Sequence, residues 1–353
     1  MRVLMTGHEG YVGTVMTGVL RSAGHDVVGL DSGLYRGCDF GPPGVSPSTE
    51  VSRDIRDVGL VDLAGFDAVV HLAALSNDPL GNQSPELTFD INHRAAVRLA
   101  ELARAAGVPR FLFASSCSLY GVAGDGLLGE DAAFRPITPY GESKVRVELE
   151  VSRLATDDFS PTFLRNATAH GVSPRLRADI VVNNLVGHAC TTGVISILSD
   201  GTPWRPMVHV QDFAGAFLAA LEAPRELVHN EAFNVGRTDE NYRVSDLADI
   251  VAECVPGSVI RYAAEGGPDP RSYRVDCSKL ESTLPGYRPR WTVRLGVEEL
   301  RDALQREELS ADELFGPRHI RLKRIQTLQD EGRLGADLRW APAVLTTPEG
   351  GSP

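Results

Sequence analysis

The sequence predicts an α/β fold in which a doubly wound parallel sheet carries helices on both faces. Apolar runs of strand length alternate with helical patterns from the first residues onward. The first run, at residues 2–5, leads through a glycine-rich turn into a helical pattern over about residues 11–23. With 353 residues, of which 42% are hydrophobic, the chain can bury one large α/β core or two closely packed ones.

Composition limits the class of ligand. A net charge of −12 argues against a nucleic-acid-binding surface. The five cysteines are scattered without a C-x-x-C pair, as in a cytoplasmic protein with reduced thiols and no metal site. No apolar run reaches about 18 residues, and the chain opens on a strand. We therefore expect a cytoplasmic location and no metal, nucleic acid or membrane partner.

The first strand, turn and helix predict a site for a diphosphate. Gly7, Gly10 and Gly13 let backbone N–H groups approach such a ligand, and the helix start carries partial positive charge. A tight turn with no ligand is the alternative. The second predicted strand, at 25–31, ends at Asp31, 18 residues beyond Gly13. A carboxylate there accepts hydrogen bonds from the adenosine ribose and repels a 2′-phosphate, which favours NAD over NADP.

The later elements follow the same alternation. Residues 32–50 are rich in Gly, Pro and Ser and predict a loop, and a second Gly-rich loop is expected before Pro139, which suits the start of a helix. Residues 309–340 are charged and helix-like, and 346–353 predict a disordered end. Apolar runs predict further strands, and apolar periodicity predicts further helices. The strands are expected at 67–74, 110–114, 161–165 and 232–236, and the helices at 92–106, 140–155, 212–221, 244–255 and 291–305.

Three polar residues predict acid–base chemistry. Tyr140 and Lys144 are four positions apart, so they share one face of the predicted helix. An ammonium there stabilises a phenolate and lowers a pKa that is about 10 in free tyrosine. Tyr140 could then exchange a proton with a substrate hydroxyl near neutral pH, while Ser116, beyond a strand end, could hold the same oxygen. An exposed Tyr/Lys pair is the alternative when this spacing stands alone.

The T-G-x-x-G-x-x-G opening at residues 6–13, Ser116 and Tyr140-x-x-x-Lys144 together resemble the extended short-chain dehydrogenase/reductase family. The closer likeness is to its nucleotide-sugar epimerase/dehydratase branch, and it covers about residues 1–305. The resemblance implies two parts and a homodimer, with helices 92–106 and 140–155 in the interface. The parts are an NAD-binding Rossmann domain with the catalytic residues at 1–171 and a smaller α/β part that mainly binds the nucleotide sugar at 172–308. A charged C-terminal extension with a disordered end, at 309–353, is expected outside the resemblance.

The resemblance also assigns site residues. Arg205 and Arg271 fall in two segments that resemble the diphosphate-binding segments of relatives, and arginine suits phosphate because it makes paired, charged hydrogen bonds. The expected cofactor contacts are Gly7, Gly10, Tyr11, Val12, Gly13, Asp31, Asp54, Ile55, Leu72, Ala73, Ala74, Tyr140 and Lys144. The expected substrate contacts are Ser76, Asn77, Cys117, Ser118, Thr168, His170, Asn183, Asn184, Arg205 and Arg271.

The sequence departs from the family at two places. Thr168 and His170 stand where relatives carry Asn and Tyr. His170 could be a second acid or base, because histidine titrates near neutrality, or a packing residue of the cleft wall. Cys117 could likewise supply an acid or base, or be a buried inert thiol. Cys117 and Ser118 occupy the places where the family's 4,6-dehydratases carry an Asp-Glu pair, which disfavours water elimination.

These patterns and the resemblance predict an NAD-dependent epimerase of a nucleoside-diphosphate sugar, acting by transient oxidation at C4. Tyr140 would take the hydroxyl proton, Ser116 would hold the reacting oxygen, and Lys144 would lower the tyrosine pKa and hold the nicotinamide ribose. A nucleotide-sugar ketoreductase and a C3 or C5 epimerase stay open as alternatives. The alternative of another class is a regulator that senses NAD without catalysis, although such proteins usually lose the Tyr/Lys pair.

Overall fold

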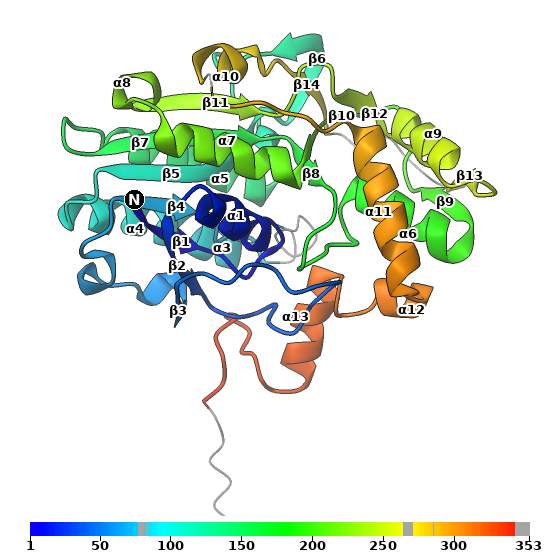
Figure 1. The fold of residues 1–353 in the computed structure, drawn as a ribbon, viewed down its shortest axis with the longest axis horizontal. Helices are drawn as coiled ribbons and strands as arrows, with labels where there is room; N and C mark the ends of the chain where they lie inside the picture. The colour runs from blue at the N-terminus through cyan, green and yellow to red at the C-terminus, as the bar shows by residue number, and fades with distance from the viewer. Residues whose placement is uncertain (77–80, 82–83, 264–270, 285, 343–353) are drawn as a thin grey trace, which may run out of the picture.

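A seven-stranded parallel sheet lies at the centre of the larger part of the molecule (Figure 1). The computed structural model describes residues 1–76, 81, 84–263, 271–284 and 286–342. The strand order is β11-β7-β5-β4-β1-β2-β3, and it reverses direction of growth between β1 and β4. The sheet therefore confirms the doubly wound fold class. Its strands are β1 (Arg2–Thr6), β2 (Asp26–Asp31), β3 (Thr49–Ser52), β4 (Ala68–His71), β5 (Arg110–Ser116), β7 (Ser160–Asn166) and β11 (Glu231–Val235).

Helices cover both faces of the sheet, and alternate residues of each strand reach opposite faces. In β1, Val3 and Met5 pack with α1 and α7, whereas Leu4 packs with α4 and α5 on the other face. All three side chains are almost fully buried, as expected for a parallel sheet covered on both sides. The helices of this part are α1 (Tyr11–Ser22), η1 (Ile55–Asp57), η2 (Leu60–Leu63), α3 (Pro85–Thr88), η3 (Phe89–Arg94), α4 (Ala95–Ala105), η4 (Cys117–Tyr120), α5 (Pro139–Ser152), α7 (Val210–Glu222), α8 (Arg225–Val228) and α10 (Ser278–Thr283).

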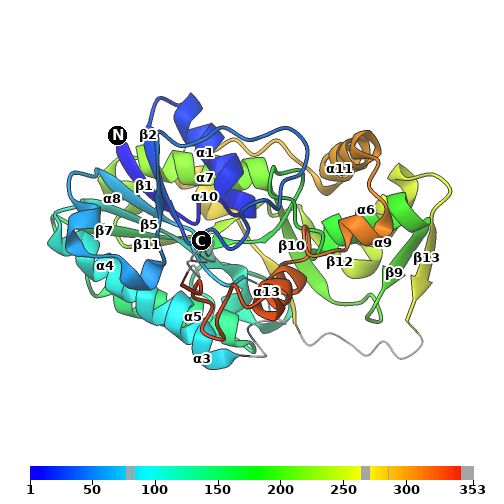
Figure 2. The same ribbon diagram turned by 90° about the horizontal axis from the view of Figure 1, so that it is seen from below.

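A smaller α/β part lies beside the carboxyl ends of the central strands (Figure 2). It contains a three-stranded sheet of order β12-β10-β8 and a separate pair, β13-β9. Helix α11 packs on α6 and α9. The elements are β8 (Thr168–His170), α6 (Val181–Thr192), β9 (Val194–Ile197), β10 (Trp204–His209), β12 (Asn241–Arg243), α9 (Val244–Cys254), β13 (Val259–Tyr262) and α11 (Val293–Glu307). Although α7 and β11 fall within residues 172–308, they belong to the larger part, so the division into domains stays a prediction.

Several predicted elements differ from those observed. The helix expected to begin at residue 92 begins earlier, as α3 and η3 lead directly into α4. The expected loop before Pro139 contains β6 (Val122–Leu128), which pairs with β14 (Ser272–Val275). That pairing joins segments far apart in the chain, so the local Gly-rich sequence gives no sign of it. The expected disorder at 346–353 lies outside the described residues.

The C-terminal extension packs on both parts of the molecule, with its first helix on α6 and its second helix against the larger part. It forms α12 (Ala311–Leu314) and α13 (Arg321–Asp330), and α13 is drawn in orange-red in Figure 1. Leu328 and Leu334 are buried in the same hydrophobic cluster as Leu4 of the central sheet. The helical character of this segment was expected, but its contribution to the core was not. Within the described residues, no helix is both long and apolar enough to cross a bilayer.

A buried ion pair fixes α5 to the sheet. The Arg165 guanidinium of β7 lies 2.7 Å from the Glu148 carboxylate of α5, and each residue is only 5% exposed. Ser115 of β5 donates a hydrogen bond to the same carboxylate, and Arg165 also donates to the carbonyl of Glu130 at 2.6 Å. This network ties together the strand end that carries Ser116 and the helix that carries the Tyr/Lys pair.

Replacing Arg165 by methionine should lower the free energy of unfolding by about 3–5 kcal/mol, because it leaves the Glu148 carboxylate buried without its partner. Urea unfolding followed by circular dichroism measures the change. The matched control is Arg146→Met on the same helix, whose pair with Glu142 is 46% exposed on each side and should contribute less than about 1 kcal/mol. Equal losses in the two variants would contradict this account of the network.

Candidate active site

A cavity of about 900 Å³ lies at the carboxyl ends of the central strands, between the two parts of the molecule. Gly7 follows β1 and Leu72 follows β4, so the cavity spans the point where the strand order reverses. Open parallel sheets bind ligands in this crevice. The cavity continues to residues 196–199 and to Arg205 of the smaller part. Its size is at the upper end of the range for small-molecule sites, which suits an extended ligand or two ligands side by side.

The glycine turn provides a close-fitting cradle. Gly7 has φ +77°, and a Cβ atom there would lie 2.7 Å from the Ala73 nitrogen of the β4 loop. A Cβ atom on Gly13 would lie 2.2 Å from the Gly7 carbonyl oxygen, so neither position accepts a side chain. The first turn of α1 has Gly10 as N-cap and no side-chain cap, so its N–H groups are left for a ligand. This end of the cavity therefore fits the diphosphate of the expected NAD.

Two acidic residues lie farther along the same wall. The Asp31 carboxylate accepts hydrogen bonds from the backbone N–H groups of Glu9 (3.1 Å) and Gly33 (2.8 Å), and burial raises its pKa. The carboxylate is thus held at the end of β2, at the place expected for a contact with ribose. Burial opposes ionisation of Asp54, but hydrogen bonds from Arg56 lower its pKa. Arg56 pairs with that carboxylate at 2.7 Å, and Asp54 lines the cavity.

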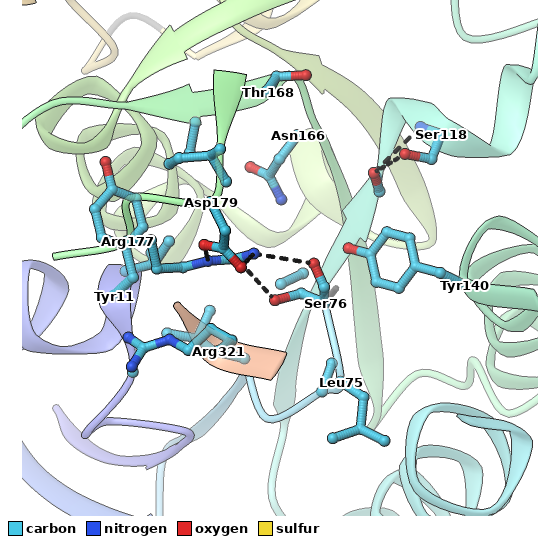
Figure 3. A pocket seen from close by; sticks show the side chains of 18 of the residues that line it. Tyr11, Leu75, Ser76, Ser118, Tyr140, Asn166, Thr168, Arg177, Asp179 and Arg321 are labelled. Carbon is cyan, nitrogen blue, oxygen red and sulfur yellow. Dashed lines mark hydrogen bonds and ion pairs between the residues drawn. The ribbon is translucent and has the colours of Figure 1, made fainter. Parts of the chain in front are cut away.

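Ser116, Tyr140 and Lys144 all line the cavity. Thr138 caps α5 by accepting a hydrogen bond from Gly141 N, which sets Tyr140 in the first turn of the helix. Lys144 follows one turn later, with its Nζ 5.4 Å from the centre of the Tyr140 ring. The Ser116 hydroxyl accepts from the Ser118 N–H at 3.1 Å and lies 3.0 Å from its hydroxyl oxygen. Figure 3 shows Tyr140 and Ser118 projecting from the same side of the cavity.

Burial controls the charge of Lys144. Its side chain is 3% exposed and donates a hydrogen bond to the carbonyl of Ala114 at 2.7 Å. Burial lowers the pKa of Lys144 to about 7, and the Glu148 carboxylate opposes this shift only in part. In the cofactor-free protein, Lys144 is therefore a full cation only below about pH 7. The lowering of the Tyr140 pKa expected from the sequence acts in that range, or when a bound anion restores the charge.

Most of the expected substrate residues line the cavity away from the glycine turn. Arg205 of β10 donates to its neighbour's carbonyl at 2.8 Å and to the carbonyl of Arg271, so the two arginines are joined. Both line the cavity. Asn184 also lines it, although its amide N–H donates to the Ala178 carbonyl at 2.9 Å. Ser76, Ser118 and Thr168 complete the set that the structure brings together. Asn77 lies outside the described residues.

Three expected substrate residues lie elsewhere. His170 is 1% exposed against the ring of His209, and burial lowers its pKa well below the usual value. Cys117 is 1% exposed, and burial raises the pKa of its thiol. Asn183 is 2% exposed and donates to the carbonyl of Arg177 at 2.9 Å. None of the three lines the cavity, so the structure supports the packing alternative for His170 and the inert thiol for Cys117.

Sequence reasoning missed several lining residues. Asn166 donates to the carbonyls of Ser115 (2.9 Å) and Leu164 (2.8 Å), while its buried Oδ1 has no hydrogen-bond partner among the described residues. Its position at the end of β7 matches that of Ser116 at the end of β5, and that signal could have identified it. Arg177 is not among the missed residues, because its guanidinium is a candidate phosphate donor from the sequence. It pairs with Asp179 and donates to Ser76 Oγ at 2.9 Å, as the dashed lines in Figure 3 show. Tyr35, Tyr273, Arg321 and Leu338 also line the cavity.

Most of the chain is similar to known proteins. The model described as the NAD dependent epimerase/dehydratase family matches residues 3–236. The UDP-glucose 4-epimerase of Mycolicibacterium smegmatis is 32% identical over 308 residues, which cover 84% of this chain and 96% of that protein. The UDP-glucose 4-epimerase of Lactobacillus helveticus is 29% identical over 82% of this chain and 92% of its own length. The solved structure of MoeE5 in complex with UDP-glucose and NAD is 30% identical, with a TM-score of 0.75, and covers 88% of this chain and 100% of its own.

Burial of Lys144 predicts a pH-dependent stability. The folded protein charges this lysine at a pKa of about 7, against 10.5 in the unfolded chain. Between these pH values the unfolded chain binds more protons, so the contribution of Lys144 to the free energy of unfolding rises with pH. Below about pH 7 the lysine is charged in both states, and the penalty is fully present. Urea unfolding of the cofactor-free protein should therefore show that its free energy of unfolding increases between pH 7 and pH 9. This increase should be larger than the increase in the Lys144→Met variant.

A direct titration checks the same expectation. The sequence contains three lysines, so NMR of protein labelled at lysine Cε gives few signals, and the one lost in Lys144→Met is assigned. Its midpoint should lie near pH 7 in the absence of cofactor. A midpoint near 10.5 would show that burial does not perturb this group.

Proposed function

The chain belongs to the NAD dependent epimerase/dehydratase family, and on this premise we propose that it is a nucleoside-diphosphate-sugar 4-epimerase. One observation carries the proposal. A single cavity brings Ser116, Tyr140 and Lys144 together between a glycine cradle for the cofactor and the arginine pair in the smaller part. An epimerase needs this arrangement, because the reacting carbon must lie between the cofactor and the anchor of the nucleotide.

The chain's own residues handle the proton. Tyr140 removes the proton of the C4 hydroxyl, and Ser116 donates a hydrogen bond to the oxygen as it becomes a carbonyl. A dinucleotide held by the glycine turn and Asp31 would supply the reversible hydride acceptor for C4, so that the hydride could return to the opposite face of the ketone. Tyr140 then gives its proton back to the oxygen, so atoms and electrons balance within one turnover. The Ala114 carbonyl fixes the position of the Lys144 ammonium beside the phenol.

The substrate is a nucleoside-diphosphate sugar held at both ends. Arg205 and Arg271 bind its diphosphate, and the sugar extends toward Tyr140. UDP-glucose is the first substrate to test, because the two relatives described above are UDP-glucose 4-epimerases and the structure of MoeE5 contains UDP-glucose. Remote binding at the diphosphate leaves the sugar free to turn, so that either face of a 4-ketone can meet the cofactor.

Buried acid–base groups weigh against epimerisation by carbon deprotonation at C3 or C5. That chemistry needs a second acid or base beside the sugar ring. The two candidates from the sequence, Cys117 and His170, are each 1% exposed and lie outside the cavity lining. Burial moves the pKa of the thiol upward and that of the imidazole downward, so both groups are neutral at physiological pH.

The homodimer stays a prediction with one supporting feature. Helices α4 and α5 pack side by side on one face of the sheet, and Leu149 of α5 is 51% exposed there. An aliphatic side chain exposed on a helix pair suits a contact between two copies. The cytoplasmic location also stays a prediction, since it rests only on the scattered cysteines and the lack of long apolar runs in the sequence.

Incubation with UDP-glucose and related nucleotide sugars should give the C4 epimer with no net change in NADH absorbance. Tyr140→Phe should lower kcat by roughly 10²–10⁴-fold, because it deletes only the proton-transferring oxygen, while NAD stays bound. Tyr262→Phe is the matched control, since Tyr262 is 54% exposed on β13, outside the cavity lining. Consumption of one NADH for each product would establish the ketoreductase instead, and full activity of Tyr140→Phe would remove its proposed role.

A further inference from the structure

The C-terminal extension forms part of the cavity wall at the cofactor end. Arg321, Leu322 and Leu338 line the cavity beside Asp31 and Ile55. All three come from the extension, beyond residues 3–236 that the family model matches. Nothing in the sequence of the glycine turn or of the Tyr/Lys pair requires such a segment. We therefore ask which function the extension has at this end of the cavity.

Specific contacts dock the extension on the loops that follow β2 and β3. The Arg324 guanidinium donates to the carbonyls of Leu34 (3.3 Å) and Arg36 (3.0 Å), in the loop that begins after Asp31. The Arg339 guanidinium pairs with the carboxylate of Asp57 at the end of η1. These loops carry the residues expected to contact the adenosine. The extension is thus attached to the adenosine end of the site at two separate points.

Apolar burial adds to this attachment. Ile325, Leu328, Leu334 and Leu338 are at most 4% exposed, and they belong to the same cluster as Ile55. Burying aliphatic side chains of this size stabilises a fold. Four such side chains, together with the polar contacts, keep the segment docked in the folded protein. The extension is therefore a constant part of this wall.

Arg321 is the polar residue of the extension that reaches the cavity. It is 3% exposed, and its guanidinium carbon lies 3.9 Å from the centre of the Tyr35 ring. Its Nη2 donates to the carbonyl of Arg175 at 3.0 Å, and Arg175 in turn donates to the carbonyl of Glu9 in the glycine turn at 3.2 Å. Figure 3 shows the Arg321 side chain below Tyr11, the first residue of α1. The guanidinium is thus one hydrogen-bonded residue away from the diphosphate cradle.

The charge and hydrogen bonds of Arg321 are incomplete in the protein alone. Its buried Nη1 has no hydrogen-bond partner within the part of the chain that the structure describes. The Arg177 guanidinium lies close enough to act on it electrostatically, and the nearby Asp179 carboxylate pairs directly with Arg177 at 2.9 Å. A buried N–H group left unpaired destabilises the fold, and does so more strongly when the group is charged. An anion bound in the cavity would supply both the missing acceptor and the missing negative charge.

We propose that Arg321 binds the pyrophosphate of the dinucleotide, so that the C-terminal extension completes the NAD site. The sugar-nucleotide diphosphate is the other anion expected in the cavity, and under the proposed function Arg205 and Arg271, which line the cavity, bind it. Arg321 stacks instead on Tyr35, which follows shortly after Asp31 at the adenosine end. The inference rests on NAD as the resident cofactor and is independent of the reaction at C4. Because Arg321 belongs to the extension, NAD should bind tightly only while the extension is docked.

Binding of NAD fragments to the cofactor-free protein tests the proposal without any turnover. ADP-ribose contains the pyrophosphate, whereas adenosine has the same base and ribose without it. By titration calorimetry, Arg321→Met should bind ADP-ribose roughly ten- to a hundredfold more weakly than the unaltered protein, and adenosine about equally well. Lys323→Met removes the same charge from an exposed position on α13, and should change neither affinity.

Unchanged ADP-ribose affinity in Arg321→Met would overturn the proposal, and so would an equal loss of affinity for adenosine. In a parallel titration with UDP, a loss of affinity for UDP alone would also overturn it. If Arg321→Met does not fold, hydrogen exchange of the unaltered protein decides. Saturating NAD should slow exchange of the amides of α13, and exchange that NAD leaves unchanged there would also overturn the assignment. Because none of these readouts requires a sugar substrate, a failure of the 4-epimerase proposal would leave them interpretable.

Discussion

The absence of side chains at two glycines sets the geometry on which the site depends. With no room for a Cβ atom on Gly7 or Gly13, the turn after β1 packs directly against the loop after β4 and against its own helix. The start of α1 then faces the crevice where the strand order reverses, and a diphosphate placed there is directed along the ends of β1 and β4. Asp31 lies toward one end of that path and Tyr140 toward the other. We therefore expect this steric constraint to determine which end of a bound dinucleotide meets α5.

Electrostatics in the same region couple the fold to the chemistry. The buried pair of Arg165 and Glu148 holds α5 against the sheet, and this places the Lys144 ammonium in a site where burial lowers its pKa to about 7. In the absence of ligand, a charged Lys144 lowers the free energy of unfolding of the protein. A dinucleotide would bring negative charge into this cavity, so its binding should favour the charged form of Lys144, which we propose assists proton transfer by Tyr140. We therefore expect cofactor binding to raise the pKa of Lys144.

Local patterns in the sequence were sufficient to predict the central fold and to select three polar residues that line one cavity, Ser116, Tyr140 and Lys144. Glycine spacing located the turn, the four-residue interval placed Tyr140 and Lys144 on one helix face, and strand ends located Ser116. Patterns of this kind work because backbone geometry links nearby residues directly. The same reasoning did not find Asn166, although it stands at an equivalent strand end, because the family pattern drew attention to Thr168 instead.

Contacts between distant segments were beyond such patterns. The pairing of β6 with β14 and the docking of the extension near Asp31 depend on where the chain returns in space. Burial also could not be seen in advance for His170 and Cys117, whose side chains are of types that serve equally as active-site groups and as packing. In each case the deciding quantity was the environment of the side chain, which a residue type alone does not specify.

The central claim is that the hydrogen removed from C4 returns to the same sugar within one turnover, and an isotope label tests it most directly. A nucleotide sugar deuterated at C4 should be incubated with the enzyme in ordinary water, with unlabelled NAD added in excess. The account predicts that the C4 epimer retains its deuterium and that none appears in the free cofactor. Loss of the label to water, or its transfer to the added NAD, would contradict the proposed mechanism.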